Sequence, residues 1–390
     1  MKKICWFFVL LPILSMAQSY EKLHRKAIVV DTHNDFPNKS IDKAVSFNQD
    51  LRKRTHSDLN RMKQGGIDVQ VFSIWSDGTF TKGKGFERAN REIDSVYAWA
   101  SRNPQDMMIA KNYSDLKKAI RKNKLAVMMG VEGGHMMEDN IDYLDKLYER
   151  GVRYMTLTWN NSTSWASSAM EETNNTVPGG KKGLTDFGEQ VVKRMNQLGM
   201  IVDISHVGEQ TFWDAIRVST KPVIASHSCV YQLSPVFRNL NDEQIKAIGK
   251  NGGVIHLNFY SGFLDSGFNN RNTKFLQAHK KETDSLRAIN PEDYFVQEYL
   301  FEKYPEEVKS LRPPLSLLID HLDYIVKLIG VDHVGLGSDF DGISSSPQGL
   351  DDVTGFPNIT KALMERGYSD KDIRKILGGN FIRVFRANQR

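Results

Sequence analysis

A histidine and a carboxylate stand two residues apart at the end of an apolar run near the start of the chain. The run 28–32 leads into His33, Asn34 and Asp35. In an extended strand, residues i and i+2 point to the same side, so His33 and Asp35 can bind one metal ion together. A lone His-x-Asp pair is a weak motif, and an ordinary polar strand end is the alternative interpretation. The rest of the chain decides between the two.

Four later apolar runs also end in residues that could bind metal or move a proton, namely Glu132, His206, His227 and Asp339. Each of these residues alone has a plainer explanation as a polar strand end, a turn or a helix N-cap. Their shared position directly after a predicted strand favours a common site, because the strand ends of a barrel surround one mouth.

The predicted metal ligands are His33, Asp35, Glu132, His206 and His227. Imidazole and carboxylate groups suit zinc, and five ligands exceed what one tetrahedral zinc with an open position binds. Two ions that share a carboxylate would use all five. Two metals about 3.5 Å apart can hold a hydroxide between them and polarise a carbonyl, which predicts amide hydrolysis. Asp339 is left as the acid/base that takes the proton from the bridging water and delivers it to the leaving nitrogen.

The elements that would position these residues are eight apolar strands, each followed by a helix. We expect the strands at 28–32, 69–75, 125–131, 154–158, 200–204, 222–225, 253–260 and 333–339, and helices that include 51–65, 85–103 and 370–377. This alternation predicts a closed (β/α)8 TIM barrel, with a doubly wound open sheet as the alternative. The stretch 261–312 follows the seventh strand and predicts an inserted pair of helices that narrows or lids the cleft, or makes a dimer contact.

The first 17 residues have the pattern of a secretory signal peptide. Lys2 and Lys3 precede an apolar run that ends in Ser15-Met16-Ala17, and the small residues fit signal peptidase cleavage. A retained N-terminal anchor is the alternative. We therefore expect an exported protein, periplasmic or secreted, with a single metallohydrolase domain at 18–390 that contains the insertion 261–312. No later apolar run is long enough for a membrane span.

Composition excludes several classes of protein. The 390 residues are 40% hydrophobic and 25% charged, as in an ordinary globular domain. The formal charge of +5 falls to +3 without the two signal lysines, which is too small and too scattered to indicate a nucleic-acid partner. Only Cys229 remains after removal of Cys5, so no internal disulfide is possible in the mature chain.

Eight segments together resemble the membrane (renal-type) dipeptidase family of binuclear zinc peptidases, a branch of the amidohydrolase-like barrels. The resemblance runs from about Tyr20 to near the C-terminus. The segments are Asp31-Thr32-His33-Asn34-Asp35, Glu132-Gly133-Gly134, Gly151-Val152-Arg153-Tyr154 with Leu157-Thr158, Asp203-Ile204-Ser205-His206-Val207, Ser226-His227-Ser228, Arg238-Asn239-Leu240, Asn258-Phe259-Tyr260 and Gly337-Ser338-Asp339-Phe340-Asp341-Gly342.

The resemblance implies a role for each matching residue. One zinc would bind His33 and Asp35, a second would bind His206 and His227, and Glu132 would bridge the two zinc ions of each chain. Asp339 would handle the proton. By the same resemblance, Arg238 would pair with the C-terminal carboxylate of a dipeptide, with Tyr260 among the substrate-binding residues, and the protein would be a homodimer. On its own, Arg238 would be taken for an ordinary surface arginine.

The chain departs from the family after the fourth predicted strand. Family members commonly have a Leu-Thr-His run there, whose histidine contacts the substrate and can stabilise the oxyanion, whereas this chain has Leu157-Thr158-Trp159-Asn160-Asn161. Trp159 cannot replace an imidazolium, although its indole N–H is a donor. Asn160 or Asn161 could supply a neutral donor, which would change specificity or slow the reaction. The family's disulfide is also missing, since Cys229 stands alone.

The sequence thus predicts a zinc dipeptidase for small dipeptides. Two alternatives stay open at this point. One is a related amidase or deacylase that acts on N-acyl or D-configured amino acids, which would need a different carboxylate clamp. The other, suggested by Trp159, is a catalytically retired barrel that only binds a ligand.

Overall fold

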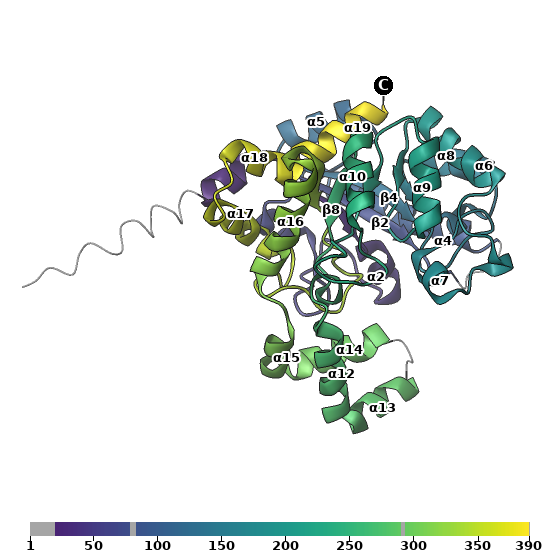
Figure 1. Cartoon of the computed structure of the whole chain (residues 1–390). Helices are drawn as coiled ribbons and strands as arrows, with labels where there is room; N and C mark the ends of the chain where they lie inside the picture. The colour runs from purple at the N-terminus through teal and green to yellow at the C-terminus, as the bar shows by residue number, and fades with distance from the viewer. Residues whose placement is uncertain (1–19, 79–82, 290–292, 390) are drawn as a thin grey trace, which may run out of the picture.

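Eight parallel strands form a nearly closed barrel at the centre of the molecule (Figure 1). The computed structural model describes residues 20–78, 83–289 and 293–389, and the predicted signal peptide at 1–17 lies outside them. Around the barrel, the strands are β1 (Val30–Asn34), β2 (Val69–Trp75), β4 (Leu125–Glu132), β5 (Val152–Thr156), β6 (Ile201–Asp203), β7 (Ile224–Ala225), β8 (Val254–Leu257) and β9 (Val334–Leu336). The predicted TIM barrel is confirmed, and the open-sheet alternative is wrong.

The first and last strands meet just beyond their ends. Asn34 and Phe340 form a parallel bridge. The Asp339 N–H donates to the His33 carbonyl at 3.0 Å, and the Asp35 N–H donates to the Phe340 carbonyl at 2.9 Å. These backbone hydrogen bonds join the two segments that contain three of the predicted site residues. An additional short strand that the sequence did not predict, β3 (Met107–Ile109), pairs with β4 outside this ring.

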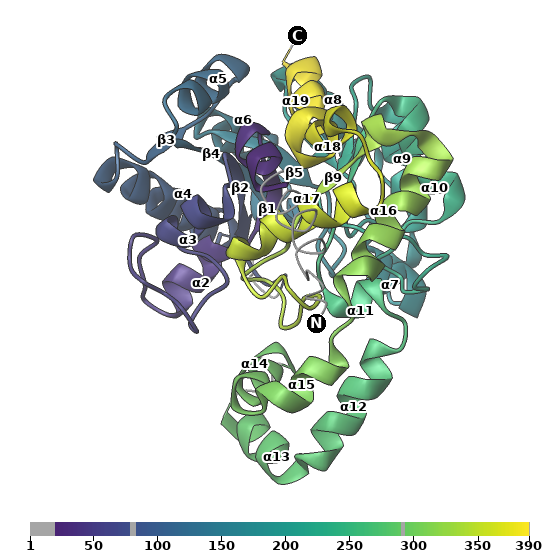
Figure 2. The same ribbon diagram turned by 90° about the vertical axis from the view of Figure 1, so that its left-hand side faces the viewer.

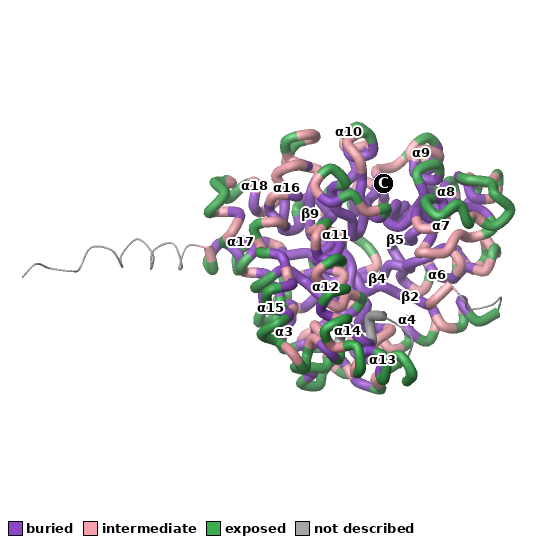
Figure 3. Tube along the Cα trace, turned by 60° about the horizontal axis from the view of Figure 1, so that its bottom comes forward, coloured by how far each residue is buried: buried purple, intermediate pink, exposed green. Residues whose placement is uncertain are grey.

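Apolar side chains alternate between the barrel interior and the surrounding helices, since successive strand residues point to opposite faces. Val69, Val71, Ala126 and Met128 lie in one buried cluster, which also contains Phe381 and Phe385 of the last helix. Their strand neighbours, such as Phe72 and Val127, belong to a second and larger cluster beneath the outer helices. Figure 3 shows this arrangement as buried strands surrounded by helices with exposed outer faces.

The surrounding helices mostly follow the predicted pattern. They are α2 (Phe36–Asp42), α3 (Leu59–Gly65), α4 (Gly85–Arg102), α5 (Tyr113–Arg121), α6 (Ile141–Glu149), α7 (Ala169–Asn174), α8 (Asp186–Leu198), α9 (Glu209–Val218), α10 (Asp242–Asn251), α16 (Leu315–Ile329), α17 (Phe356–Glu365), α18 (Asp370–Arg374) and α19 (Asn380–Asn388). The helix predicted at 51–65 begins only at Leu59, because the Asp58 side chain accepts the Arg61 N–H and caps it there. Helix α2 was not predicted.

The stretch 261–312 forms a helical lobe beyond one end of the barrel (Figures 1 and 2). Its described residues form five helices rather than the predicted pair: α11 (Ser261–Leu264), α12 (Phe268–Ala278), α13 (Lys280–Ile289), α14 (Asp293–Lys303) and α15 (Pro305–Leu311). The lobe lies at the end of the barrel where α2 and α7 follow their strands, opposite α5 and α19. It has a small apolar cluster of its own, which includes Phe268, Phe275 and Leu300.

Across the described residues, no helix is both long enough and apolar enough to cross a membrane.

Candidate functional site

Glu132, at the end of β4, lies at the centre of a buried cluster of three histidines. Its Oε1 is 2.9 Å from His206 Nε2 and 3.3 Å from His227 Nε2. Its other oxygen, Oε2, is 3.5 Å from His33 Nε2. All four residues are buried, the most exposed being His206 at 7%. One carboxylate therefore faces two histidines with one oxygen and a third histidine with the other.

Each histidine is oriented through its second ring nitrogen. Tyr154 Oη donates to the Thr32 carbonyl at 3.0 Å and accepts from His33 Nδ1 at 2.8 Å. Ser226 Oγ donates to Asp203 Oδ2 at 2.6 Å and accepts from His227 Nδ1 at 2.8 Å.

The third histidine has an equivalent partner. His206 Nδ1 donates to Asn160 Oδ1 at 3.1 Å. All three histidines thus donate from Nδ1 and direct Nε2 toward Glu132, which leaves Nε2 as the nitrogen that can bind metal. Gly130 makes room for one of the orienting groups, since a Cβ there would lie 2.1 Å from the Tyr154 ring.

This arrangement fits a metal ion better than it fits the protein alone. His206 Nε2 and His227 Nε2 are only 3.0 Å apart, so two lone pairs face each other next to a carboxylate oxygen. Burial lowers the pKa of His206 to about 4 and the pKa of His227 well below its ordinary value, so neither ring is protonated at neutral pH. Ligand atoms on a tetrahedral zinc are about 3.3 Å apart, since each lies roughly 2.0–2.1 Å from the ion. The three spacings around Glu132 Oε1 match this geometry.

A second group of possible ligands surrounds His33. Its Nε2 is 3.6 Å from Asp35 Oδ2 and makes no hydrogen bond to any described residue. Burial lowers the pKa of His33, but the charges of Glu132 and Asp35 outweigh this effect and raise it to about 10. This position therefore favours a cation, either a proton or a metal ion. Ligand atoms of His33, Asp35 and Asp339 all lie within 4.8 Å of one another.

Asp339 is held beside this group by its backbone and by an amide. Its Oδ2 accepts from Asn258 Nδ2 at 2.8 Å. Burial raises the pKa of Asp339, and the nearby Glu132 charge raises it further. Asp339 and His206 have left-handed backbone angles, with φ of 60° and 63°, a conformation that non-glycine residues adopt at a cost and that is common at functional sites. Gly342 packs so tightly here that a Cβ would lie 2.2 Å from Asp35 Oδ2.

Arg238, which the sequence placed on the substrate, is buried at 4% exposure between two cavities. Its Nη2 donates weakly to the His227 carbonyl at 3.4 Å, its guanidinium lies over the Phe263 ring at 5.3 Å, and its Nε has no partner among the described residues. Burial lowers the pKa of Arg238 to about 10, so the group stays charged at neutral pH. A buried cation without a paired carboxylate is suited to bind an anionic group.

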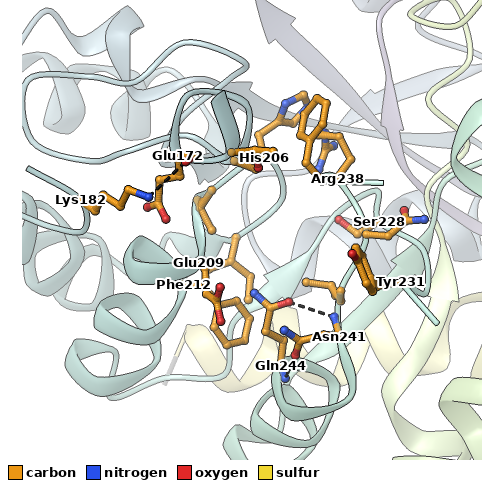
Figure 4. A pocket seen from close by; sticks show the side chains of 17 residues that line it. Glu172, Lys182, His206, Glu209, Phe212, Ser228, Tyr231, Arg238, Asn241 and Gln244 are labelled. Atoms are coloured by element: carbon orange, nitrogen blue, oxygen red, sulfur yellow. Dashed lines mark hydrogen bonds between the residues drawn. The ribbon is translucent and has the colours of Figure 1, made fainter. Parts of the chain in front are cut away.

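The smaller cavity is a side chamber of about 410 Å³. Figure 4 shows it between His206 and Arg238 on one side and Phe212 and Gln244 on the other. The larger cavity, of about 1290 Å³, opens in front of Glu132 and Asp339.

Tyr260, Trp159 and Asn160, the other predicted substrate residues, line the larger cavity. Trp159 packs edge-on against Trp75, with ring centroids 5.0 Å apart, and its ring lies 6.4 Å from that of His206. An aromatic wall thus stands where the family commonly has an imidazole. Asn160 contacts His206 in addition to facing the cavity, so it also orients a predicted ligand.

The structure brings together the predicted ligands, Asp339, Arg238, Tyr260, Trp159 and Asn160, whereas Asn161 is outside the cavity lining. It also gives a role to residues that the sequence indicated only as parts of the resemblance. Tyr154, Ser226 and Asn258 orient His33, His227 and Asp339, respectively. The signal that could have found Ser226 is its position directly before a predicted ligand. Tyr154 ends the segment Gly151-Val152-Arg153-Tyr154 of the resemblance, but nothing local indicates its role, because it reaches His33 across the barrel.

Comparisons with known proteins agree with this geometry. Residues 17–390 match the membrane dipeptidase family, peptidase family M19. An uncharacterized dipeptidase of Schizosaccharomyces pombe is 31% identical over 393 aligned positions, covering 95% of this chain and 83% of that protein.

Solved structures share the fold. The probable dipeptidase PvdM of Pseudomonas aeruginosa superposes with a TM-score of 0.78 at 26% identity, covering 96% of this chain and 99% of that one. A metallo peptidase of Rhodobacter sphaeroides, solved with a phosphinate mimic of the dipeptide L-Ala-D-Ala, has a TM-score of 0.74 at 22% identity and covers 93% of this chain and 100% of its own.

Proposed function

This chain belongs to the membrane dipeptidase family, peptidase family M19, and from that premise we propose that it hydrolyses the peptide bond of small dipeptides with two zinc ions. The observation that carries the proposal is the position of Glu132 between two sets of ligand atoms, with one oxygen toward His206 and His227 and the other toward His33. A single carboxylate in that position can serve two ions.

The zinc ions, when bound, would polarise the scissile carbonyl and lower the pKa of a water enough for it to attack near neutral pH. His33 and Asp35 would hold one ion, His206 and His227 the other, and Glu132 both. Because the three histidines are already oriented by Tyr154, Asn160 and Ser226, the ligand set requires little rearrangement.

Asp339 is the residue we propose to move the proton. Burial keeps its pKa above that of an ordinary carboxyl group, and its hydrogen bond from Asn258 fixes one oxygen. Asp339 also shares a side-chain hydrogen bond with Asp35; with Asp35 holding an ion, Asp339 would accept a proton from the attacking water and deliver it to the leaving nitrogen.

Arg238 would bind the C-terminal carboxylate of the substrate. A guanidinium at a fixed distance from the reacting carbonyl selects dipeptides, because a longer peptide has no carboxylate at that position. The dipeptide mimic in the Rhodobacter sphaeroides relative supports this substrate class. Export to the periplasm or the medium, and a homodimer, remain our predictions for this chain.

The test is to load the purified protein with zinc, count the ions by elemental analysis and measure hydrolysis of L-Ala-L-Ala, its C-terminal amide and N-acetyl-L-alanine. We expect two zinc ions per chain, hydrolysis of the free dipeptide about 10- to 100-fold faster than of its C-terminal amide, no hydrolysis of N-acetyl-L-alanine, and loss of activity on chelation. Preferential cleavage of N-acetyl-L-alanine would favour the amidase alternative. Bound zinc without turnover of any dipeptide would favour a binding protein, and a single ion at saturation would contradict the shared role of Glu132.

A further inference from the structure

The larger cavity is more spacious than a dipeptide requires. Its volume is about 1290 Å³, whereas pockets that enclose whole drug-sized ligands are typically about 300–1,000 Å³. Glu132 and Asp339 lie at its inner end, and the outer part is lined by helices α12, α13 and α14 of the lobe. Space therefore continues from the reacting centre to the lobe.

The face of the lobe toward this cavity contains polar side chains that are almost completely buried. Asn272, Thr283 and Gln297 are 7%, 3% and 8% exposed, and all three line the cavity. Thr283 Oγ1 donates to the Leu276 carbonyl at 3.1 Å, and Gln297 Oε1 accepts from Ser344 Oγ at 2.8 Å. Asn272 Oδ1, in contrast, has no hydrogen-bond partner among the described residues. A buried acceptor without a donor is costly unless a ligand supplies one.

The apolar core of the lobe does not require these polar residues. The lobe packs through its own apolar cluster, which includes Phe275, Leu286 and Val296, and Asn272 and Thr283 lie next to it, three residues before Phe275 and Leu286 on α12 and α13, while they also line the cavity. Burying amides next to that cluster adds nothing to its stability. Their position is better explained by the cavity they face.

The lobe is tied to the rim of the barrel, so it acts as a wall of the cavity. Arg312 Nε donates to the Ser346 carbonyl at 2.6 Å, and the Ser261 N–H donates to the Ser345 carbonyl at 2.9 Å. Together with the Gln297–Ser344 hydrogen bond, these contacts hold the lobe to the loop that follows Asp339. These contacts therefore fix the position of the outer part of the cavity relative to the reacting centre.

The chemistry of the lobe face favours a neutral ligand that donates hydrogen bonds. Besides Asn272 it presents Asn269, Thr273 and Gln277, together with Leu276 and with Arg287, which already has an interaction partner. Lys280, the lysine that α13 contributes to the lining, pairs with Asp284 at 2.7 Å, so these two charges compensate each other. Amide and hydroxyl groups of a ligand would match this face, and an apolar chain would leave Asn272 Oδ1 without a donor.

We propose that the lobe binds a neutral, amide-bearing substituent on the amino-terminal residue of the substrate. The proposal rests on the proposed dipeptidase function: with Arg238 assigned to the C-terminal carboxylate, we assign the group that extends toward the lobe to the amino-terminal residue. The preferred substrate is then a dipeptide whose first residue carries an extended, peptide-like side chain, with Asn272 Oδ1 accepting one of its N–H groups.

Three substrates with the same leaving alanine test this assignment. They are L-Ala-L-Ala, a glutaminyl-alanine whose side-chain amide carries glycylglycinamide, and the same compound with an alkyl chain of equal length. For the zinc-loaded wild type we expect kcat/KM to be about tenfold higher for the amide-extended substrate than for the alkyl one, since two hydrogen bonds of ordinary strength account for such a factor.

Variants of α12 identify the residue responsible. Asn272→Ala should lower kcat/KM for the amide-extended substrate by about 3- to 10-fold, the contribution of one hydrogen bond, and leave L-Ala-L-Ala and the alkyl substrate unchanged within about twofold. Asn270→Ala is the matched control, because Asn270 lies on the same helix, is exposed and is outside the cavity lining. Asn269→Ala, at an exposed lining position, should give a smaller loss in the same direction and decides the matter if Asn272→Ala does not fold.

Equal kcat/KM for the amide and alkyl substrates, or an equal loss on all three substrates in Asn272→Ala, would overturn the proposal. Failure here is distinguishable from failure of the proposed function. Wild type that hydrolyses L-Ala-L-Ala without preferring the extended substrate refutes only the role of the lobe. Zinc-loaded wild type that hydrolyses none of the three refutes the dipeptidase function, and the inference about the lobe falls with it.

Discussion

The metal centre and the helical lobe face the same cavity, but they are built in different ways. Each predicted ligand lies at or just beyond the end of a barrel strand and is buried, and each of the three histidines is oriented by a second residue, as His33 is by Tyr154. The lobe is an insertion with its own small core, and its contribution to the cavity comes from helix side chains such as Asn272. The barrel thus holds the ligand atoms at distances that suit a metal ion, while the lobe supplies a polar surface.

This difference suggests a division of labour between reactivity and selectivity. Strand ends in a barrel are held by hydrogen bonds on both sides, so a residue there keeps its geometry during a reaction. Helices α12 to α15 of the lobe can change sequence without disturbing the barrel, because their apolar residues form a cluster separate from that of the barrel. Variants in the barrel mouth should therefore affect turnover of every substrate, and variants in the lobe should affect the choice between substrates.

The largest effect should come from Glu132, which touches both groups of ligand atoms. Glu132→Gln removes the single negative charge that the two groups share and replaces one of its oxygens with an NH2 group, and we expect kcat/KM to fall at least about 10³-fold, because several kcal/mol of transition-state stabilisation depend on the ions. Zinc content measured in parallel should fall below two ions per chain. Glu209→Gln, at an exposed glutamate of the side chamber, is the control and should retain full activity and metal.

Asp339→Asn separates proton transfer from metal binding. The substitution keeps the hydrogen bond with Asn258 possible but removes the acid/base, so kcat should fall about 10²- to 10³-fold while zinc content stays close to that of the wild type. In the wild type, kcat/KM should decline as pH falls through the pKa of Asp339, which burial raises, because a general base must be deprotonated. A variant that keeps both its rate and this acid limb would show that another group moves the proton.

Arg238→Ala tests the carboxylate clamp. Loss of one charge-assisted interaction, worth about 1.5–3 kcal/mol, should lower kcat/KM for L-Ala-L-Ala by about 10- to 100-fold, mostly through KM. Activity on the C-terminal amide should change little, so the preference for a free carboxylate disappears. Arg217→Ala, at an arginine exposed at 59% in surface ion pairs, provides the control. If selectivity for the free carboxylate survives in Arg238→Ala, the clamp is elsewhere.

The smallest effect on turnover should come from a residue that only orients a ligand. Tyr154→Phe removes the acceptor of His33 Nδ1, and zinc affinity should weaken about 10- to 100-fold, while kcat at saturating zinc stays within a few fold of wild type. Competition with a chelating dye measures the affinity. Tyr97→Phe, which loses a hydrogen bond to the Arg150 carbonyl away from the site, should not change it. Unchanged affinity in Tyr154→Phe would mean that packing alone orients His33.

The sequence determined the barrel and the position of each predicted ligand around its mouth. Both follow from local patterns: apolar runs of strand length, helices between them, and a polar residue directly after a run. The sequence was less informative about segments outside the repeating alternation of strand and helix. Helix α2 and strand β3 were not predicted, and the lobe has more helices among its described residues than the predicted pair.

Only the tertiary structure decided how these residues meet. The distances around Glu132, the orientation of His33 by Tyr154, and the left-handed backbone of His206 and Asp339 depend on contacts between residues far apart in the chain. The same holds for the buried amide of Asn272, whose position toward the cavity depends on how the lobe is tied to the rim. Sequence periodicity reports which face of an element is apolar, but it carries no information about which polar group lies opposite.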